Sequence, residues 1–524
     1  MSADYNIDFA LEFAKELKEI SIAEFFEKNK HLLGFDSKIK AMLTSVKEPV
    51  DNSLDAVEEM SKALINRGKD PIYPVIMVEI DKLDNDIYRI IVEDNGPGIL
   101  KEYAPNIFGK FLYGSKFFKF IQKRGQQGIG ISSVTLYAQL TTGKPIRVIS
   151  KTLSMRNAYY MDIGINTKKN EPIVYKYGNY KGFKKEHGTR IEVCIEGKYI
   201  SKGDKSVYEY LKRTHIANPH STIIFIDPSE KKFVFKRAVN TYPELPKEIK
   251  PHPAGIEYGI LARMIINTKR SDLISFLSRD FSGVGVNTAK EILEVAKLEN
   301  KSPKELTADE IRRLLNAIRS VKVRAPPSKC LSPIGSPNIE KIMKKLFNPE
   351  FVSAVTRTPK SYRGMPFLVE VGIAYGGDIK EFKLLRYANK VPLIFDQSAC
   401  VITKAAKDVN WKTYGINVEG DKPKNIILLV HVASVWVPFT SESKYAIAHY
   451  PEIYKEVKLA IQDVCRKLKL YIARKRLLEL KMKKKKILEE YAKLVASSLA
   501  KILDEDETKI LNKIEMLIRE KIKI

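Results

Sequence analysis

The sequence predicts an α+β protein with several domains. Its 524 residues are more than one hydrophobic core usually holds, and they suggest about three to four domains. Helical and β-rich stretches alternate before about Pro228, and two proline-rich segments, at 243–253 and 326–337, then interrupt the pattern. We therefore expect domains at residues 1–235, 236–325 and 326–470, and a basic helical C-terminal region at 471–524.

Four short motifs follow one another in the first of these domains. They are EPVDN at 48–52, DNGPG at 94–98, GQQGIG at 125–130 and HGT at 187–189. Any one of them is weak evidence, because short glycine patterns recur by chance and many glycines only serve turns. Together, and in this order, they predict an ATP site.

The first motif lies in a predicted helix over residues 44–60, where Glu48, Asn52 and Asp55 are spaced to leave one face. Glu48 is suited to accept a proton from a water that attacks a γ-phosphate, and Asn52 offers an oxygen to Mg²⁺. Asp55 is expected one turn further on, behind them. The alternative is a solvated polar helix face, which is common, but the accompanying motifs favour the ATP site.

The second motif begins at the end of a predicted strand over residues 88–93. Its carboxylate, Asp94, can accept a hydrogen bond from an exocyclic amine. Gly96 and Gly98 leave room for a flat base beside the backbone, and Pro97 stiffens the loop. An ordinary Asp-Asn-Gly turn is the alternative.

The third motif, at 125–130, precedes the apolar and helix-compatible stretch 131–139. A glycine loop that opens into a helix N-terminus attracts phosphate through free N–H groups and the helix dipole. No Gly-Lys-Ser/Thr follows, so the loop is not a Walker loop. The preceding segment YGSK at 113–116 is expected to form a mobile lid, from which Ser115 and Lys116 reach the phosphates.

The motif series resembles the ATPase fold shared by DNA gyrase, the mismatch-repair ATPase MutL and the sensor histidine kinases. Within that group it is similar to the B subunits of the type IIB DNA topoisomerases, the archaeal topoisomerase VI family. The resemblance covers nearly everything before about Leu470 and is carried by residues 48–56, 92–99, 112–117, 187–189, 385–394 and 438–444. It implies a Bergerat-type α/β sandwich, a helix-two-turns-helix insert and a ribosomal-S5-like transducer domain, in that order.

The same resemblance implies individual roles. Glu48 would activate water, Asn52 would hold Mg²⁺, and Asp94 would read adenine with support from Thr189 through a water. Lys444 would insert from a distant domain onto the γ-phosphate. The other nucleotide-binding residues that it implies are Asp55, Gly96, Gly98, Ser115, Lys116, Gly125, Gln126, Gln127, Gly128, Ile129, Gly130, Ile131 and Ser132.

Position 132 departs from the pattern, since some relatives carry a lysine there. Ser132 implies a lower phosphate affinity, or another cation in that role.

The charge balance points to a polyanionic partner. Lys and Arg number 90 against 63 Asp and Glu, a formal net charge of +27. Such an excess favours DNA, because neutralised phosphates release condensed counterions. A thermophile surface would explain many charges but not their imbalance. The sequence contains no long apolar run, signal peptide or lipidation motif, so we expect no membrane attachment and a cytoplasmic, nucleoid-associated protein of an archaeal-type cell.

The cysteines and histidines indicate no metal site. Cys194, Cys330, Cys400 and Cys465 are widely separated, and we expect ordinary thiols in a reducing compartment. The seven histidines include no pair with metalloenzyme spacing.

Helical and strand patterns also recur in the rest of the chain. Predicted helices at 258–267, 271–281, 288–298 and 308–321 surround a glycine-rich turn, and either bind DNA or form a small packing module. Strands at 366–375, 391–395 and 426–436, with a helix at 453–468, predict a sheet backed by helices. The basic stretch 474–486 predicts a helical module, a DNA-facing tail or a solvated helix face.

The resemblance implies an ATP- and Mg²⁺-dependent component of a DNA topoisomerase. ATP would dimerise two B subunits around a DNA duplex, and a tyrosine-bearing A subunit would cut DNA within an A₂B₂ heterotetramer. Supercoils would be relaxed and DNA decatenated. The alternative is a MutL-like mismatch-repair ATPase; a chaperone, a kinase and a DNA-binding protein with an inactive nucleotide site fit the charge, the histidines and Glu48 less well.

Overall fold

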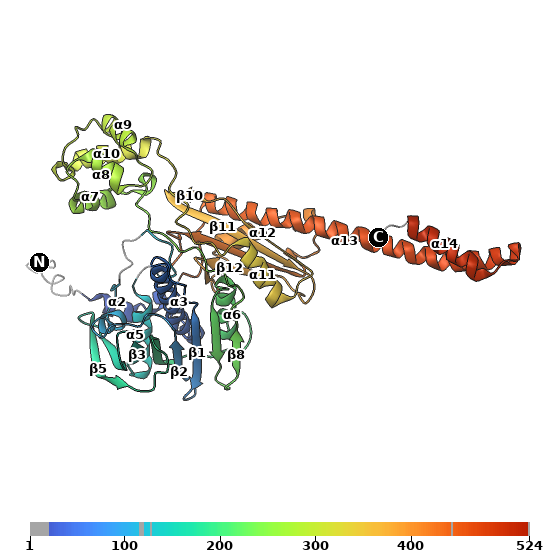
Figure 1. Ribbon diagram of the computed structural model, residues 1–524. Helices are drawn as coiled ribbons and strands as arrows, with labels where there is room; N and C mark the ends of the chain where they lie inside the picture. Colours follow the sequence, from blue (N-terminus) through green and yellow to red (C-terminus); the bar gives the residue numbers. More distant parts are fainter. Residues whose placement is uncertain (1–19, 115–119, 126–127, 442–443, 522–524) are drawn as a thin grey trace, which may run out of the picture.

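The computed structural model describes residues 20–114, 120–125, 128–441 and 444–521. Figure 1 shows a large sheet domain at the N-terminal end, a small helical domain beside it, a second sheet domain and a long helical arm. The main elements therefore follow the predicted order along the chain.

The N-terminal domain is built on an eight-stranded sheet of order β5-β4-β3-β6-β2-β1-β7-β8. All neighbouring strands are antiparallel except β1 and β7, which run parallel. In β1 and β6, buried residues alternate with partly exposed ones, as expected for a sheet covered on one face. The strands are β1 (Val75–Lys82), β2 (Ile87–Glu93), β3 (Ile146–Lys151), β4 (Ala158–Asn166), β5 (Glu171–Tyr180), β6 (Gly188–Glu196), β7 (Thr222–Ile226) and β8 (Lys232–Phe235).

Helices cover the buried face of this sheet. The longest, α3, extends beyond the predicted 44–60 because Ser37 caps it by accepting a hydrogen bond from the Lys40 amide. Its Val46, Val50 and Leu54 recur every four residues and are fully buried against the strands. The helices of this domain are α2 (Ile22–Lys28), α3 (Lys38–Ile65), α4 (Ala104–Gly109), α5 (Gly130–Thr142) and α6 (Val207–Ala217), with a 3₁₀ turn η1 (Lys30–Leu33).

The insert has a hydrophobic core of its own, which includes Phe276, Ile292 and Leu314. Its helices agree with the predicted ones to within a few residues, and Figure 1 shows them apart from the two sheet domains. The elements are η2 (Pro253–Gly255), α7 (Tyr258–Asn267), α8 (Leu273–Asp280), α9 (Val286–Ala296), η3 (Pro303–Glu305) and α10 (Ala308–Ser320).

The second sheet has the order β10-β11-β16-β12-β13, with β9 also paired to β11. Its central strands are buried at almost every residue, because α11 packs on one face and α12 and α13 on the other. The predicted strand 391–395 shortens to two residues, since Pro392 lacks an amide hydrogen for the ladder. The elements are α11 (Ser336–Phe347), β9 (Phe351–Thr356), β10 (Lys360–Tyr362), β11 (Met365–Tyr375), β12 (Lys383–Ala388), β13 (Val391–Pro392), α12 (Val401–Lys407), η4 (Trp411–Tyr414), β14 (Val418–Glu419), β15 (Lys422–Pro423) and β16 (Ile426–Ser434).

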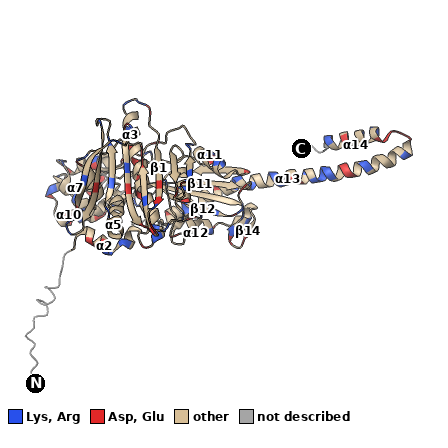
Figure 2. Ribbon diagram, turned by 90° about the horizontal axis from the view of Figure 1, so that it is seen from below, with Lys and Arg blue, Asp and Glu red and all other residues tan. Residues whose placement is uncertain are grey.

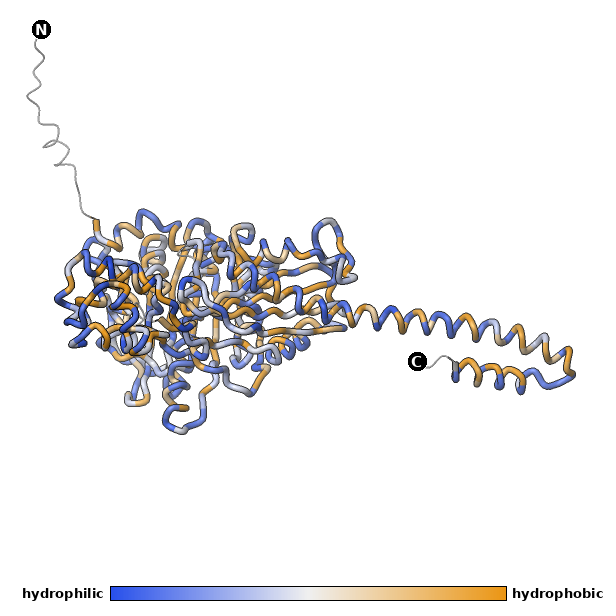
Figure 3. Tube along the Cα trace, turned by 90° about the horizontal axis from the view of Figure 1, so that it is seen from above, coloured by the Kyte–Doolittle hydropathy of each residue, from blue (hydrophilic) through white to orange (hydrophobic). Residues whose placement is uncertain are grey.

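The arm begins inside this domain. Helix α13 (Pro451–Leu503) is continuous across the predicted boundary between residues 470 and 471, so that boundary does not coincide with the end of an element. Arg357, which follows β9, pairs with two acidic residues of the buried half of α13. The other half projects from the body and turns back through α14 (Glu507–Lys521), with blue Lys and Arg residues recurring along it in Figure 2 and orange apolar ones in Figure 3.

Among the described residues, no helix combines the length and the apolar character needed to cross a membrane. All four cysteines are free thiols.

A fully buried carboxylate, Glu370, fastens the second sheet domain. It accepts hydrogen bonds from the Ile334 and Gly335 amides at 2.7 and 2.8 Å, and from the Thr356 hydroxyl at 2.8 Å. His431 Nε2 accepts from the Lys390 amide, so Nδ1 carries the proton and donates to Glu370 at 2.8 Å. Burial raises the pKa of Glu370, but His431 and the other donors outweigh it and lower the pKa overall.

Glu370→Ala should lower the free energy of unfolding of this domain by about 3–5 kcal/mol at pH 7, because it leaves four hydrogen-bond donors without their acceptor, and two of them, the Ile334 amide and the His431 ring, are buried. A carboxyl group whose pKa is lower in the folded than in the unfolded state stabilises the folded domain at pH values above its unfolded-state pKa. This contribution is lost as the pH falls through the folded-state pKa. The difference in free energy of unfolding between the variant and the unmodified protein should therefore shrink as pH falls below about 4. Denaturant unfolding followed over pH measures both effects, with exposed Glu381→Ala as control; equal stability of the two variants would contradict the assignment.

Candidate active site

A cavity of about 630 Å³ lies beside α3 and the N-terminus of α5 and reaches a loop of the second sheet domain. Its volume is in the range of small-molecule sites. The predicted site residues that line it are Glu48, Asn52, Asp94, Gly98, Gly125, Gly128, Ile129, Gly130, Ile131, Thr189 and Lys444. Residues from all four motifs and from position 444 thus meet in one place.

Helix α3 supplies Glu48 and Asn52, one turn apart on the cavity wall. Pro49 lies between them inside the helix, where it cannot donate to the carbonyl four residues earlier. Lys47 also lines the cavity, and its Nζ lies 2.7 Å from Glu48 Oε1 and 3.3 Å from Asp51 Oδ2. The base predicted from the sequence is therefore held by the residue immediately before it.

The charge state of Glu48 follows from its neighbours. Burial raises the pKa of Glu48, but the ammonium groups of Lys47 and Lys444 outweigh burial and lower it overall. Glu48 is consequently an ionised carboxylate at neutral pH and can accept a proton.

Asp94 follows β2 directly and faces the cavity from the other side. Its Oδ1 accepts from the Gly96 amide at 2.8 Å and the Thr189 amide at 3.1 Å, and its Oδ2 accepts from the Ser53 hydroxyl at 3.0 Å. Burial raises the pKa of Asp94, and these donors oppose that rise. Thr189 thus contacts Asp94 directly through its backbone, while its hydroxyl pairs with Ser150.

The glycines of the second motif also have packing roles. Gly98 has a φ of +75°, and a Cβ there would lie 2.2 Å from the Lys151 carbonyl oxygen. The loop needs this glycine in order to pack against the end of β3, besides any room that it leaves for a ligand. Gly96 is not a lining residue; its carbonyl oxygen lies 2.7 Å from His187 Nδ1 of the fourth motif.

The glycine loop leads into α5 as expected. The helix begins at Gly130, and its N-cap, Ile129, has no side-chain acceptor, so the N-terminal amides face the cavity without a cap from that residue. A Cβ on Gly130 would lie 2.0 Å from Glu48 Oε2, which shows how closely the loop approaches the predicted base. This end of α5 can therefore receive an anion next to Glu48.

Lys444 reaches the cavity from the second sheet domain. Its Nζ donates to the Arg124 carbonyl oxygen at 3.2 Å, and its φ of +57° is uncommon for a residue with a Cβ. Burial lowers the pKa of Lys444, and the nearby Glu48 carboxylate opposes this. Its neighbour Tyr445 also lines the cavity and shares a hydrogen bond of 3.1 Å with Thr44 of α3.

Some predicted site residues lie elsewhere or cannot be placed. Asp55 leaves α3 away from the cavity and pairs with Arg124 at 2.7 Å, because the helix turns it toward that buried cation. Ser132 is buried, and its hydroxyl donates to the Lys110 carbonyl oxygen. The remaining four lie outside the described residues: Ser115, Lys116, Gln126 and Gln127.

The sequence prediction does not include Lys47, Arg124 or Tyr445, which line the cavity or contact predicted site residues. Each immediately precedes or follows a predicted site residue, namely Glu48, Gly125 and Lys444. Adjacency is the only signal that the sequence offers for them, and a lone basic or aromatic residue beside a motif is usually an ordinary one.

The polar groups of the cavity are compatible with Mg²⁺. Among the described residues, no group of three or more His, Cys, Asp and Glu side chains forms a metal cage. Asn52 offers an amide oxygen to the cavity, which the Glu48 carboxylate also lines. Such a sparse set fits Mg²⁺, which commonly keeps several waters and takes its other ligands from substrate phosphates.

Comparison with known proteins places both sheet domains in families. Residues 39–198 match the family model "Histidine kinase-, DNA gyrase B-, and HSP90-like ATPase", and residues 326–485 match "Topoisomerase VI B subunit, transducer". The chain is 49% identical over 463 residues to the B subunit of type 2 DNA topoisomerase 6 from Archaeoglobus fulgidus, which covers 87% of this chain and 75% of the relative. The protein of the same name from Pyrococcus horikoshii is 40% identical over 529 residues and covers 92% and 91%.

Gly130→Ala should lower the turnover of ATP by roughly 10²- to 10⁴-fold, the usual contribution of a positioned base, because the new Cβ displaces the Glu48 carboxylate. Steady-state phosphate release measures the loss. Gly259→Ala on α7 is the control, since nothing lies within 4 Å of a Cβ at that position. Normal turnover in Gly130→Ala would mean that the close approach of the loop to Glu48 does not matter.

Proposed function

The chain belongs to the family of type 2 DNA topoisomerase 6 B subunits, and from this premise we propose how its residues carry out the ATP-driven step of that enzyme. The observation that carries the proposal is a single cavity that holds Glu48 and Asn52 of α3, Asp94 of the sheet and Lys444 of the transducer domain. ATP is the substrate of this site. A MutL-like mismatch-repair role is not favoured, because the relatives and the transducer match point to topoisomerase 6.

Hydrolysis is proposed to depend on Glu48 as general base. The two flanking ammonium groups keep it ionised, and a water between it and the γ-phosphate would give up its proton to the carboxylate. Lys444 would contact the same phosphate and stabilise negative charge on it. The free amides at the start of α5 would bind the other phosphate oxygens.

Asp94 would orient the nucleotide at the opposite end of the cavity. Its carboxylate is held by three donors and remains an acceptor, so it can take a hydrogen bond from the exocyclic amine of adenine. Mg²⁺ held by Asn52 would neutralise part of the phosphate charge.

The mechanical output follows from the origin of Lys444. A phosphate held by both domains fixes their relative orientation, and its loss after hydrolysis releases them. We infer that ATP closes two B subunits on a DNA duplex, and that a DNA-cleaving A subunit in an A₂B₂ assembly completes strand passage. Relaxation and decatenation in the cytoplasm, at the nucleoid, would be the result.

Glu48→Ala should retain ATP-dependent dimerisation but turn over ATP roughly 10²- to 10⁴-fold more slowly, since a positioned base is lost and the binding groups remain. Sedimentation with ATP and phosphate release, each with and without long duplex DNA, measure the two properties. Exposed Glu102→Ala is the matched control. Unchanged hydrolysis in Glu48→Ala would disprove the base assignment.

Lys444→Ala should bind ATP but couple it poorly to domain movement, because the transducer loses its contact with the γ-phosphate. Supercoil relaxation in the presence of an A subunit should fall more than ATP hydrolysis does. Exposed Lys422→Ala in the transducer hairpin controls for loss of a positive charge. Relaxation at the unmodified level would exclude Lys444 as the link.

A further inference from the structure

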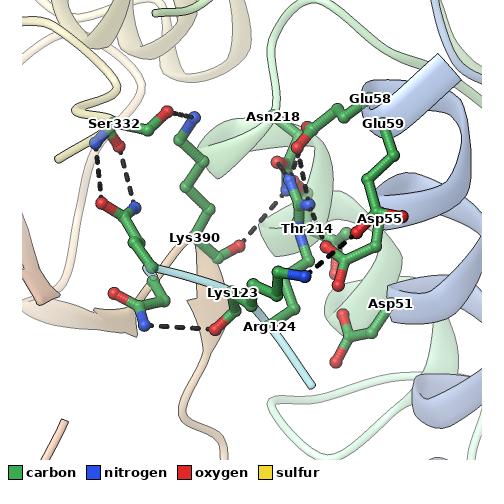
Figure 4. Close-up of polar contacts among 12 residues, drawn as sticks. Asp51, Asp55, Glu58, Glu59, Lys123, Arg124, Thr214, Asn218, Ser332 and Lys390 are labelled. Atoms are coloured by element: carbon green, nitrogen blue, oxygen red, sulfur yellow. Dashed lines mark hydrogen bonds and ion pairs between the residues drawn. The ribbon is translucent and has the colours of Figure 1, made fainter. Parts of the chain in front are cut away.

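A second set of contacts joins the glycine loop to the transducer domain outside the cavity. It lies where the segment 122–124, just before Gly125, passes between α3 and the transducer (Figure 4). All three residues of this segment contact partners far away in the sequence, and the contacts are largely buried.

The guanidinium of Arg124 is the centre of this network. It binds both oxygens of Glu58 at 2.7 and 2.9 Å, Asp55 Oδ1 at 2.7 Å and Asn218 Oδ1 at 2.5 Å, with 4% of the side chain exposed. His220 Nε2 lies 3.0 Å from the same Glu58 carboxylate. Arg124 cannot leave this place without uncovering two buried carboxylates, so it fixes the residue that precedes the glycine loop.

Two side-chain amides, of Asn218 and Asn389, link the Arg124 region to the β12–β13 turn of the transducer by hydrogen bonds. Asn218, which binds Arg124, also donates to the Lys390 carbonyl oxygen at 3.2 Å (Figure 4). Asn389 donates to the Lys123 carbonyl oxygen at 3.2 Å. The turn is thus attached both to the glycine-loop side and, through Asn218, to the end of α6.

Gln122 makes a third connection. Its side-chain amide both donates to the Ser332 carbonyl oxygen at 2.9 Å and accepts from the Ser332 amide at 2.7 Å. The Ser332 hydroxyl in turn accepts from Lys390 Nζ at 2.7 Å. The contacts therefore close a ring from Gln122 through Ser332 and Lys390 back to Arg124.

The transducer side of the ring is held by further hydrogen bonds. Asn389 and Lys390 have φ values of +48° and +66°, a conformation that persists only where the surroundings fix it. Ser434 of β16 donates to Asn389 from its backbone, and the Lys390 amide donates to His431 of the buried Glu370 pair. Displacement of the turn would therefore be passed to the central strands of the sheet.

Both routes between the domains meet at Arg124. Its side chain anchors the ring, and its carbonyl oxygen accepts the hydrogen bond from Lys444. A nucleotide that attracts Lys444 to its γ-phosphate would remove this bond. A phosphate bound to the glycine loop would shift Arg124, which directly precedes the loop.

We propose that residues 122–124 form a second mechanical link, a glycine-loop joint, which passes the position of the glycine loop to the β12–β13 turn independently of Lys444. Arg124 is a positioning residue in this joint: it acts through the loop and does not touch the substrate. The inference rests on the proposed function, because it assumes that the glycine loop binds ATP phosphates.

The joint is tested by removing the two contacts that Gln122 and Lys123 make with the transducer directly, while the cavity and the indirect contact through Asn218 stay intact. Gln122→Met removes the Ser332 pair at similar volume, and Asn389→Ala removes the bond to Lys123. Neither residue lines the cavity. Fluorophores on Lys231→Cys and Lys422→Cys, both exposed, report the distance between the N-terminal and transducer domains with and without a nonhydrolysable ATP analogue.

In the Gln122→Met/Asn389→Ala protein we expect the KM for ATP to stay within about twofold, while the analogue-induced distance change falls by at least about half. With an A subunit, strand passages per ATP hydrolysed should fall about tenfold, a typical size for coupling between two sites. Each single variant should fall between the double variant and the unmodified protein. This split between KM and coupling would not follow from a role in folding alone.

The control is Lys383→Met. Lys383 of β12 also makes ion pairs across the domain boundary, with Nζ 2.7 Å from Glu209 and 3.2 Å from Asp204, and neither partner belongs to segment 122–124 or to the glycine loop. It should leave the distance change and the coupling ratio as they are.

The outcomes separate the two proposals. The joint would be overturned if both single variants and the double variant showed the same distance change and coupling ratio as Lys383→Met. It would also be overturned if Lys383→Met lost as much of the distance change and coupling as the double variant does. If the double variant does not fold, the single variants decide in the same way. An unmodified protein with no analogue-induced change would refute the proposed function, and the joint with it.

Discussion

The structure depends on one lysine of the transducer domain being held inside the cavity of the N-terminal domain. Lys444 is tolerated there because Glu48 supplies an opposite charge and the Arg124 carbonyl oxygen accepts a hydrogen bond from its ammonium group. Lys47 also faces Glu48, so one carboxylate sits between two ammonium groups. Because Lys444 comes from the transducer and Glu48 from α3, the domain boundary is an electrostatic part of the site.

The two sheets suit different tasks. The N-terminal sheet has one face covered by helices and places its motifs at strand and helix ends around the cavity. The transducer sheet is covered on both faces, and its central strands are buried throughout. A sheet of the second kind moves as a unit, because its packed core does not deform continuously. A small change at Lys444 or at the β12–β13 turn can then reach α13, which packs on that sheet and extends into the arm.

Much of this could be predicted from local sequence. The helices of the insert and α3 follow from helix-compatible stretches, β11 and β16 from strand-like apolar runs, and Glu48, Asn52 and Asp94 from short motifs. The orientation of Asp55 could not be predicted, because the spacing that places it on the face of Glu48 says nothing of a buried arginine 69 residues away. The steric need for glycine at position 98 could not be predicted either, because the contacting carbonyl belongs to Lys151, in a strand that is distant in the sequence. Long-range packing decides both.

The polar character of the boundary near Arg124 has a physical consequence of its own. Buried ion pairs and amide contacts recover little more than their desolvation cost, so they hold two domains less firmly than an apolar interface of the same size. They do, however, fix one geometry, because each donor has a specified acceptor and a shift leaves a buried charge without a partner. The side-chain amides of Gln122, Asn218 and Asn389 illustrate this: each bonds one specified group across the boundary, and no apolar contact could replace them while still distinguishing one loop position from another. A boundary of that kind is weak enough to change state and specific enough for the states to be discrete, which is what the proposed coupling of nucleotide binding to domain movement requires.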